Sequence, residues 1–351
     1  MPIKVNFQEA SLAAMTLAKI GNPLRSEPLR TSKQLCRFEE SEAELLTHCF
    51  LKSFRALELH QLHHHSDIRD NELWKYAAAI FNDNESLLEQ GAAIARHLHA
   101  KSNHPNIKSG DLCVALIDDV LVDGKATQAL SIIKSESKVP FLQISERDGD
   151  LRLTTEQGIY PDKIDKGCLI VDNDRGNGCA VYLFDKSGGN THFWTRDFVG
   201  ARPVKNDDYL TRHFSKLCME FAEKGLPEET MQEERMDVAS RAIAYLSETD
   251  DFDLDDFQTK ALEKPDRIEQ FAAFKDDYQE ETGSELEDKF TVSKTEAKKA
   301  QKRLKSRLKL DVGVELRFSS GFISQSEQFL ERGHDEDRDM DYVKVWFYKE
   351  V

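Results

Sequence analysis

Residues 112–137, LCVALIDDVLVDGKATQALSIIKSES, indicate a β-hairpin, because they join two long apolar runs through the turn sequence DGK. Shorter β-rich runs follow as far as HFWTRDF at 192–198, separated by turn sequences such as RDGD and RGNG. We therefore predict an antiparallel sheet of six or seven strands over residues 111–197. Connections of hairpin length leave no room for crossover helices, which argues against a parallel, doubly wound sheet.

Residues 1–108, on the amino-terminal side of this sheet, have a mostly helical pattern. Apolar residues recur at three- and four-residue steps over 12–20, 40–62 and 73–81, and again from Asn84 onward. The sequence Gly-Asn-Pro at 21–23 ends the first of these runs. We therefore predict four helices before the sheet.

The segment 226–290, on the carboxyl-terminal side, is strongly acidic. It holds 21 Asp and Glu residues against 7 Lys and Arg, a net charge of −14. Large apolar residues such as Phe257 and Phe271 recur within it, so we predict an acidic helical module rather than a disordered tail.

The last part of the chain begins with a basic segment. The sequence KTEAKKAQKRLKSRLK at 294–309 carries eight cations and one glutamate, a net charge of +7. Its apolar residues at 297, 300, 304 and 308 fit one side of a helix that would run to Leu310. Alternating apolar residues over 312–318 and 343–347 predict short strands.

These patterns together predict an α+β protein. We expect a helical amino-terminal region at 1–108, a central antiparallel sheet at 109–205, an acidic helical module at 206–290, and a basic helix with β-strands at 291–351.

Composition limits the classes of function. The 351-residue chain has a formal net charge of −16, which excludes a uniformly basic nucleic-acid-binding protein but leaves room for a local basic surface. No run approaches the ~20 apolar residues of a membrane span, and no secretion signal opens the chain. Five of the six cysteines have apolar neighbours, which indicates buried free thiols. We expect a cytoplasmic protein that does not bind membranes.

The basic segment is the predicted DNA-binding surface, since clustered cations bind the phosphate backbone and release its counterions. The alternative is a solvated helix that only balances the acidic module. No helix-turn-helix or zinc-finger spacing indicates base recognition. The predicted DNA-binding residues are Lys298, Lys299, Lys302, Arg303, Lys305, Arg307 and Lys309.

A metal-dependent nuclease is an alternative. Asp118 and Asp119 end one predicted strand, and the next carries Glu136 and Lys138 in a Glu-x-Lys pattern. Asp111, at the start of the first of these strands, is a third candidate for the required acid. In restriction-type nucleases two carboxylates hold Mg²⁺ and a lysine orients the attacking water. The competing interpretation is a surface ion pair on an exposed sheet face. We expect the protein not to be an enzyme, with Mg²⁺ as a cofactor only under the nuclease alternative and no other metal site.

Several long blocks resemble the bacterial nucleoid-associated protein family of the NdpA/YejK type. They are SNHPNIKSGDL (102–112), ALSIIKSESKVPFL (129–142), FWTRDFVGARPVKNDDYLTRHF (193–214), RLKSRLKLDVGVELRF (303–318) and ERGHDEDRDMDYVKVWFYKE (331–350). The resemblance implies a cytoplasmic protein located at the nucleoid, which binds DNA directly or through partners such as a type II topoisomerase. It supplies no catalytic residues.

The sequence therefore leaves three functions open. The first is a non-enzymatic nucleoid-associated protein that binds DNA without sequence preference, or binds DNA-processing enzymes. The second is the Mg²⁺-dependent nuclease with Asp118 or Asp119, Glu136 and Lys138. The third is a protein-binding adaptor whose acidic module mimics the charge of DNA. The sequence leaves the oligomeric state open.

Overall fold

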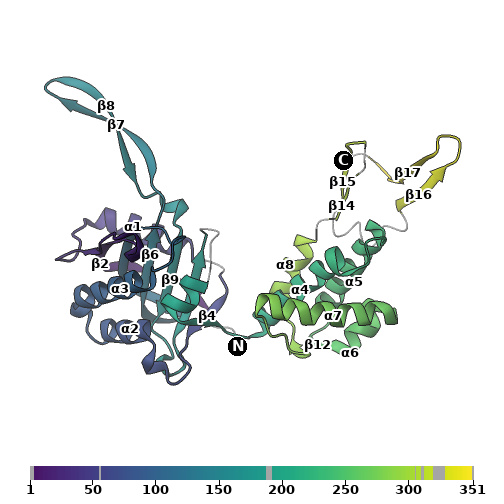
Figure 1. Cartoon of the computed structure of the whole chain (residues 1–351), viewed down its shortest axis with the longest axis horizontal. Helices are drawn as coiled ribbons and strands as arrows, with labels where there is room; N and C mark the ends of the chain where they lie inside the picture. Colours follow the sequence, from purple (N-terminus) through teal and green to yellow (C-terminus); the bar gives the residue numbers. More distant parts are fainter. Residues whose placement is uncertain are drawn as a thin grey trace. The chain divides into compact units, whose positions relative to one another are not determined.

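The computed structural model describes residues 4–54, 57–186, 192–304, 306–309, 312–318 and 329–349. The chain forms two compact units, Met1–Val204 and Lys205–Val351 (Figure 1). Helices and antiparallel strands are both present, so the predicted α+β class is confirmed.

The first unit is built on one sheet. Within the described residues nine strands form it, in the order β11-β4-β10-β9-β6-β5-β2-β3 with β1 beside β5, and each pair of neighbours is antiparallel. The antiparallel sheet predicted from residue 111 onward is therefore present, but its last predicted strand, HFWTRDF at 192–198, is wrong, because Phe193–Val199 form a π-helical segment. The strands are β1 (Val5–Asn6), β2 (Ser11–Ile20), β3 (Arg30–Thr31), β4 (Leu59–Leu62), β5 (Gly110–Val122), β6 (Lys125–Ser135), β9 (Lys166–Val171), β10 (Ala180–Asp185) and β11 (Ala201–Pro203).

Helices cover both faces of this sheet. One face packs against α2 (Glu72–Asn82), α3 (Leu87–Lys101) and the π-helical segment Phe193–Val199, which bury Ile80, Ile94 and Trp194. The other face packs against α1 (Glu40–Lys52) through Phe50 and Leu51. Short 3-10 turns lie at Pro23–Arg25, Ile68–Asp70, Asn84–Ser86, Pro161–Lys163 and Arg175–Asn177.

The helix predicted over residues 12–20 is wrong, because this segment is strand β2. β2 lies inside the sheet, so side chains on both of its faces are buried: Met15 packs under α1 and Ile20 packs under α2 and α3. A register shift between Leu12 and Ala14 adds a further break in the alternation. The register shift and the burial of both faces interrupt the period of two over residues 12–16, although it returns over residues 16–20, and the spacing of Leu12, Met15 and Ala18 imitated a helix.

The other predicted helices of this region are partly correct. The helix predicted over 73–81 is α2, and the one predicted from Asn84 is α3, which begins at Leu87. The helix predicted over 40–62 ends at Lys52, and Leu59–Leu62 form β4 between β10 and β11. Residues 1–108 are therefore a mixed region that contributes strands to the central sheet.

Two strands of the predicted sheet stand apart from it. β7 (Val139–Arg147) and β8 (Asp150–Gly158) pair only with each other among the described residues, and they project from the first unit as a long hairpin (Figure 1). Almost all of their residues are exposed.

The second unit is mainly helical. Its core is rich in phenylalanine, with Phe214 of α4 in contact with the rings of Phe252, Phe257 and Phe271. The helices are α4 (Asp207–Glu220), α5 (Gln232–Glu248), α6 (Leu254–Phe257), α7 (Pro265–Thr282) and α8 (Lys294–Arg303), with π-helical segments at Phe221–Gly225 and Gln258–Leu262. β12 (Asp251–Asp253) and β13 (Lys289–Thr291) pair antiparallel although α6 and α7 separate them in the chain. The hairpins are β14 (Ser306–Lys309) with β15 (Glu315–Phe318), and β16 (Leu330–Asp335) with β17 (Met340–Val345).

The acidic segment and the basic helix share one hydrophobic core. Phe271 of α7, inside the acidic segment 226–290, belongs to the same buried cluster as Ala297 and Ala300 of α8. The acidic helices are therefore part of the fold that holds α8 in place, and not a separately folded module.

Candidate functional site

The basic residues of α8 lie on one face of the helix. Lys298, Lys299, Lys302 and Arg303 are all exposed, and the steps of three and four residues between them place them within an arc of about 140°. Glu296, Ala297 and Ala300 form the opposite, buried face. We call the four exposed cations the α8 cation strip.

The buried face fixes the orientation of this strip. Ser293 caps the helix by accepting a hydrogen bond from the backbone N–H of Glu296 at 3.4 Å. The Glu296 carboxylate accepts hydrogen bonds from Arg212 of α4 at 2.9 Å and from Lys299 at 2.7 Å. Burial tends to raise the pKa of Glu296, but these two cations outweigh it and hold the pKa below its usual value. The glutamate therefore stays ionised and ties α8 to α4.

The cations of the basic segment differ in whether they already form ion pairs within the protein. The ammonium of Lys294 is 2.9 Å from the Asp250 carboxylate and donates to the carbonyl of Thr249. The ammonium of Lys299 forms an ion pair with the Glu296 carboxylate at 2.7 Å. Lys298, Lys302 and Arg303 form no ion pair with any described residue. These three cations are the ones most available to an external anion.

The predicted basic helix is shorter than expected. It ends at Arg303 and does not continue to Leu310, because Ser306–Lys309 form β14 and pair with β15. Leu308 lies opposite Leu316 in that hairpin, so its apolar spacing served a strand and not a helix. Of the predicted DNA-binding residues, Lys305 lies outside the described residues, as do the side chains of Arg307 and Lys309.

The structure does not assemble the predicted nuclease site. In the strand pair β5–β6, Ile117, just before Asp118 and Asp119, lies opposite Ala129. Ser135, just before Glu136, lies opposite Asp111, at the other end of β5. Seven residues of strand separate the two positions, which is about 23 Å. Asp118 accepts a hydrogen bond from Gln128 at 2.8 Å, and Asp119 is exposed at a bulge.

Glu136 and Lys138 also do not share a strand face. β6 ends at Ser135, and the backbone N–H groups of Glu136 and Ser137 donate to the Asp165 carboxylate at 2.6 and 3.0 Å. The ammonium of Lys138 is 3.1 Å from Asp111, while Glu136 turns inward. Because the Asp165 side chain binds the backbone of residues 136 and 137, this segment does not continue the strand, and its side chains do not alternate between two faces. Glu136 and Lys138 therefore do not point to the same side, as the nuclease hypothesis required.

Glu136 belongs to a buried charged cluster that the sequence did not indicate. Its carboxylate is 2.8 Å from the ammonium of Lys134 and 3.6 Å from that of Lys166, which is in turn 2.8 Å from Asp185. All four side chains are at most 5% exposed. Burial lowers the pKa of Lys134, and the neighbouring Glu136 partly opposes this shift. The only signal was a lysine near the end of one apolar strand, Lys134, and another at the start of the next strand of the sheet, Lys166.

This cluster is a poor metal site. The two ammonium groups occupy the positions around the Glu136 carboxylate that a divalent cation would need. Across the described ranges, no group of three or more His, Cys, Asp or Glu side chains is placed to hold a metal ion. The arrangement is that of a neutralised internal network.

The architecture and charges define a class: a two-unit α+β protein with an acidic total charge and one exposed cation strip on a carboxyl-terminal helix. None of its described helices is long and apolar enough to cross a membrane. A family model described as nucleoid-associated protein YejK (NA37) matches residues 19–338, and the chain therefore belongs to this family of nucleoid-associated proteins. No curated protein matches the chain.

Proposed function

We propose that the protein binds the phosphate backbone of DNA through the α8 cation strip, without sequence preference. Membership of a nucleoid-associated family supports a role at the nucleoid, in the cytoplasm. The observation that carries the proposal is the set Lys298, Lys302 and Arg303, which are exposed on one helix face and form no ion pair with any described residue.

The chemistry of the strip suits phosphates rather than bases. The four cations lie within six residues, about 8 Å of helix axis, and can meet several phosphates, because duplex DNA carries one charge per ~1.7 Å of its axis. No aromatic side chain lies among them in KTEAKKAQKR, so base stacking has no platform on this face. The binding energy would come from counterion release, which is independent of sequence and steeply dependent on salt.

The test is a titration of labelled duplexes of unrelated sequence by fluorescence anisotropy at several salt concentrations. The triple variant Lys298→Gln/Lys302→Gln/Arg303→Gln should bind every duplex more weakly. Its plot of log affinity against log salt should be less steep by about 2.7, or about 0.9 for each lost phosphate contact.

A matched control distinguishes the effect of where the cations are removed from the effect of the change in net charge. Lys216→Gln/Lys224→Gln/Lys260→Gln removes three cations that are also exposed but are paired with Glu220 or Asp256 at 2.9 to 3.5 Å. This variant should bind DNA as the wild type does. Equal affinity of the α8 variant and the wild type, or equal losses in both triple variants, would remove α8 as the binding surface.

A second candidate function is capture of a basic partner protein, such as a type II topoisomerase or another DNA-processing enzyme. The observation that favours it is the charge of the exposed face of α7. The only two cations of this helix, Arg267 and Lys275, lie on its buried face and are paired with Glu234 and Asp288. The exposed face carries only carboxylates among its charged groups, as a DNA-mimicking adaptor would: Asp266, Glu269, Asp276, Asp277, Glu280 and Glu281.

Its test uses binding of purified topoisomerase to the immobilised full chain. Neutralising three of these carboxylates in Asp276→Asn/Asp277→Asn/Glu280→Gln should weaken capture and leave DNA affinity no lower than in the wild type. Undiminished capture by this variant would exclude α7 as the partner surface.

A further inference from the structure

The β7–β8 hairpin has one apolar face. Residues directly opposite each other in an antiparallel pair share a face, and Ile144 lies opposite Leu153. Two residues along each strand, Leu142 and Leu151 lie on the same face. These four side chains are 65 to 70% exposed. We call them the hairpin apolar face.

The other face of the hairpin is mainly polar. Gln143 lies opposite Thr154, and Arg147 lies opposite Asp150. Phe141 is the one large apolar residue there, opposite Glu156 near the base of the hairpin. Such one-sided patterning is typical of a sheet that buries one face, yet in this chain the hairpin projects away from the body of its unit (Figure 1). An isolated two-stranded hairpin is only marginally stable in water, so this one needs a partner.

We propose that the hairpin apolar face packs against the same face of a second copy of this chain, forming a two-fold symmetric dimer. A symmetric contact requires a self-complementary surface, and a flat patch of four aliphatic side chains meets that requirement. Glu146 is the only charged residue on this face, so a phosphate backbone would meet no cation there.

The size of the face agrees with a reversible dimer. Strands of nine residues span about 30 Å, and two of them side by side are about 10 Å wide. Such a face outlines about 300 Å² in each copy, so covering it in both copies buries roughly 600 to 1,000 Å² in total, at or below the lower limit of stable specific interfaces. We therefore expect a dimer that dissociates on dilution.

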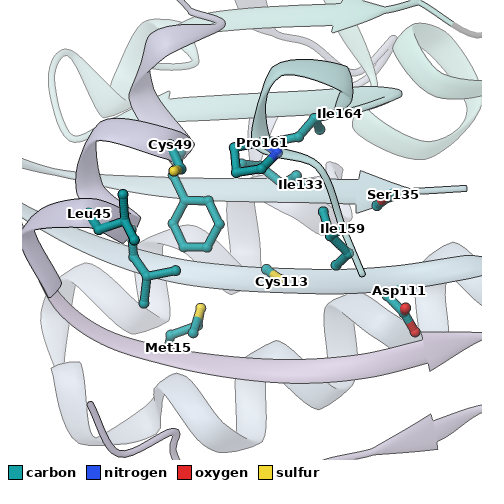
Figure 2. Close-up of a pocket in the computed structure, with 12 residues that line it drawn as sticks. Met15, Leu45, Cys49, Asp111, Cys113, Ile133, Ser135, Ile159, Pro161 and Ile164 are labelled. Atoms are coloured by element: carbon teal, nitrogen blue, oxygen red, sulfur yellow. The ribbon is translucent and has the colours of Figure 1, made fainter. Parts of the chain in front are cut away.

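An apolar pocket at the base of the hairpin favours an antiparallel arrangement of the two hairpins. The pocket has a volume of about 200 Å³ and lies between α1 and the sheet, with Ile159 and Pro161, just after β8, in its wall (Figure 2). Leu45 and Ile159 at this pocket are 63% and 40% exposed. Antiparallel packing places the tip of each hairpin, with Leu151, at the base of the other, where it covers this apolar surface.

The first test measures the mass of the full chain by sedimentation over a range of concentrations. The wild type should shift with rising concentration from 40.2 kDa toward twice that mass. Ile144→Arg/Leu153→Arg should remain monomeric, because it places two charges on the apolar face. Gln143→Arg/Thr154→Arg adds the same charges to the opposite face at neighbouring positions, and it should dimerise as the wild type does.

The second test is an oxidative cross-link. Thr155 lies on the hairpin apolar face opposite Leu142, and Thr154 lies on the other face. Thr155→Cys should form a covalent dimer on mild oxidation, whereas Thr154→Cys and the wild type should not, since five native cysteines are buried and Cys36 is half-buried. A wild type that stays at 40.2 kDa at every concentration, or a dimer that persists in Ile144→Arg/Leu153→Arg, would overturn the proposal.

Discussion

The carboxylate of Glu136 faces the ammonium of Lys134 inside the first unit, with the two side chains 3% and 0% exposed. Lys134 also donates to the carbonyl of Lys108 at 2.6 Å, so the pair is fully engaged by the protein. Taking two charges out of water is costly, and the pair is tolerated because each charge has a partner. Removing one partner leaves the other charge buried and uncompensated.

Glu136→Gln should therefore destabilise the protein. We expect the free energy of unfolding, measured by urea denaturation, to fall by about 3 kcal/mol. Glu156→Gln is the matched control, because Glu156 is exposed on the hairpin, and it should change stability by less than about 0.5 kcal/mol. Neither variant nor the wild type should nick supercoiled plasmid in Mg²⁺. Nicking by the wild type that is lost in Glu136→Gln would show that the cluster is catalytic.

The burial of Glu136 could not be predicted from its neighbours in the sequence. Its partner Lys166 follows it by 30 positions, and Asp185 by a further 19, so only the pairing of β6, β9 and β10 brings them together. The cysteines show the opposite case. Five of them, including Cys168 and Cys218, have apolar neighbours along the chain, and the prediction that they are buried is confirmed. The neighbours of a residue in the sequence therefore predict its burial only where the residues that surround it in the structure are close to it along the chain.

Secondary structure elements were predictable where one face alone is buried. α2 covers the sheet from one side and keeps the helical spacing of its buried residues Leu73, Ala77 and Ile80, so its bounds were predicted within one residue. β2 buries side chains on both faces around its register shift, with Met15 on one face and Thr16 on the other, and was mistaken for a helix. The basic helix was extended too far because Leu308, four residues after Leu304, fits the helical period, whereas it lies in the hairpin opposite Leu316.

The packing of α3 on β2 depends on a close approach at Gly91. A Cβ atom added to Gly91 would meet the Cγ2 methyl group of Thr16 on β2. The Thr16 hydroxyl is fixed by the Ser32 hydroxyl at 2.6 Å, so the methyl group cannot easily turn away. Glycine inside this 15-residue helix therefore serves the contact between helix and strand, despite its low helix propensity.

Gly91→Ala should destabilise the protein although alanine is the better helix former. Overpacking costs about 1–3 kcal/mol, which exceeds the ~1 kcal/mol gained from helix propensity. Thr16→Ser removes the opposing methyl group and keeps the hydroxyl, so the double variant Thr16→Ser/Gly91→Ala should recover most of the loss. Urea midpoints of the single and double variants measure this coupling. A stabilising Gly91→Ala single variant would contradict the close approach.

At the scale of the whole molecule, the chain divides its proposed roles between two units with separate cores. The core of Lys205–Val351 includes the residues that anchor α8, such as Ala297 and Ala300, and the core of Met1–Val204 lies on both faces of the large sheet. The proposed dimer contact belongs to the first unit, and the proposed DNA contact belongs to the second. Neither assignment follows from the total charge of −16, which is an average over both units.

This division gives a prediction that links the two proposals. A dimer carries two α8 cation strips, and linking two weak sites raises the apparent affinity wherever both can engage. Ile144→Arg/Leu153→Arg should therefore bind a duplex of about 40 base pairs at least about tenfold more weakly than the wild type does. On a duplex of about 10 base pairs, which has room for one strip, the two proteins should bind alike.

Gln143→Arg/Thr154→Arg controls for the added charge, because it carries the same two arginines on the opposite face of the hairpin and should keep the wild-type affinity on both duplexes. Anisotropy titrations at one fixed salt concentration measure all three proteins on both lengths. A similar loss on the short and the long duplex would mean that the hairpin itself contacts DNA, since lost bivalency can only act where two sites fit. No loss on either length would show that a single α8 strip carries the whole affinity and that dimerisation serves another purpose.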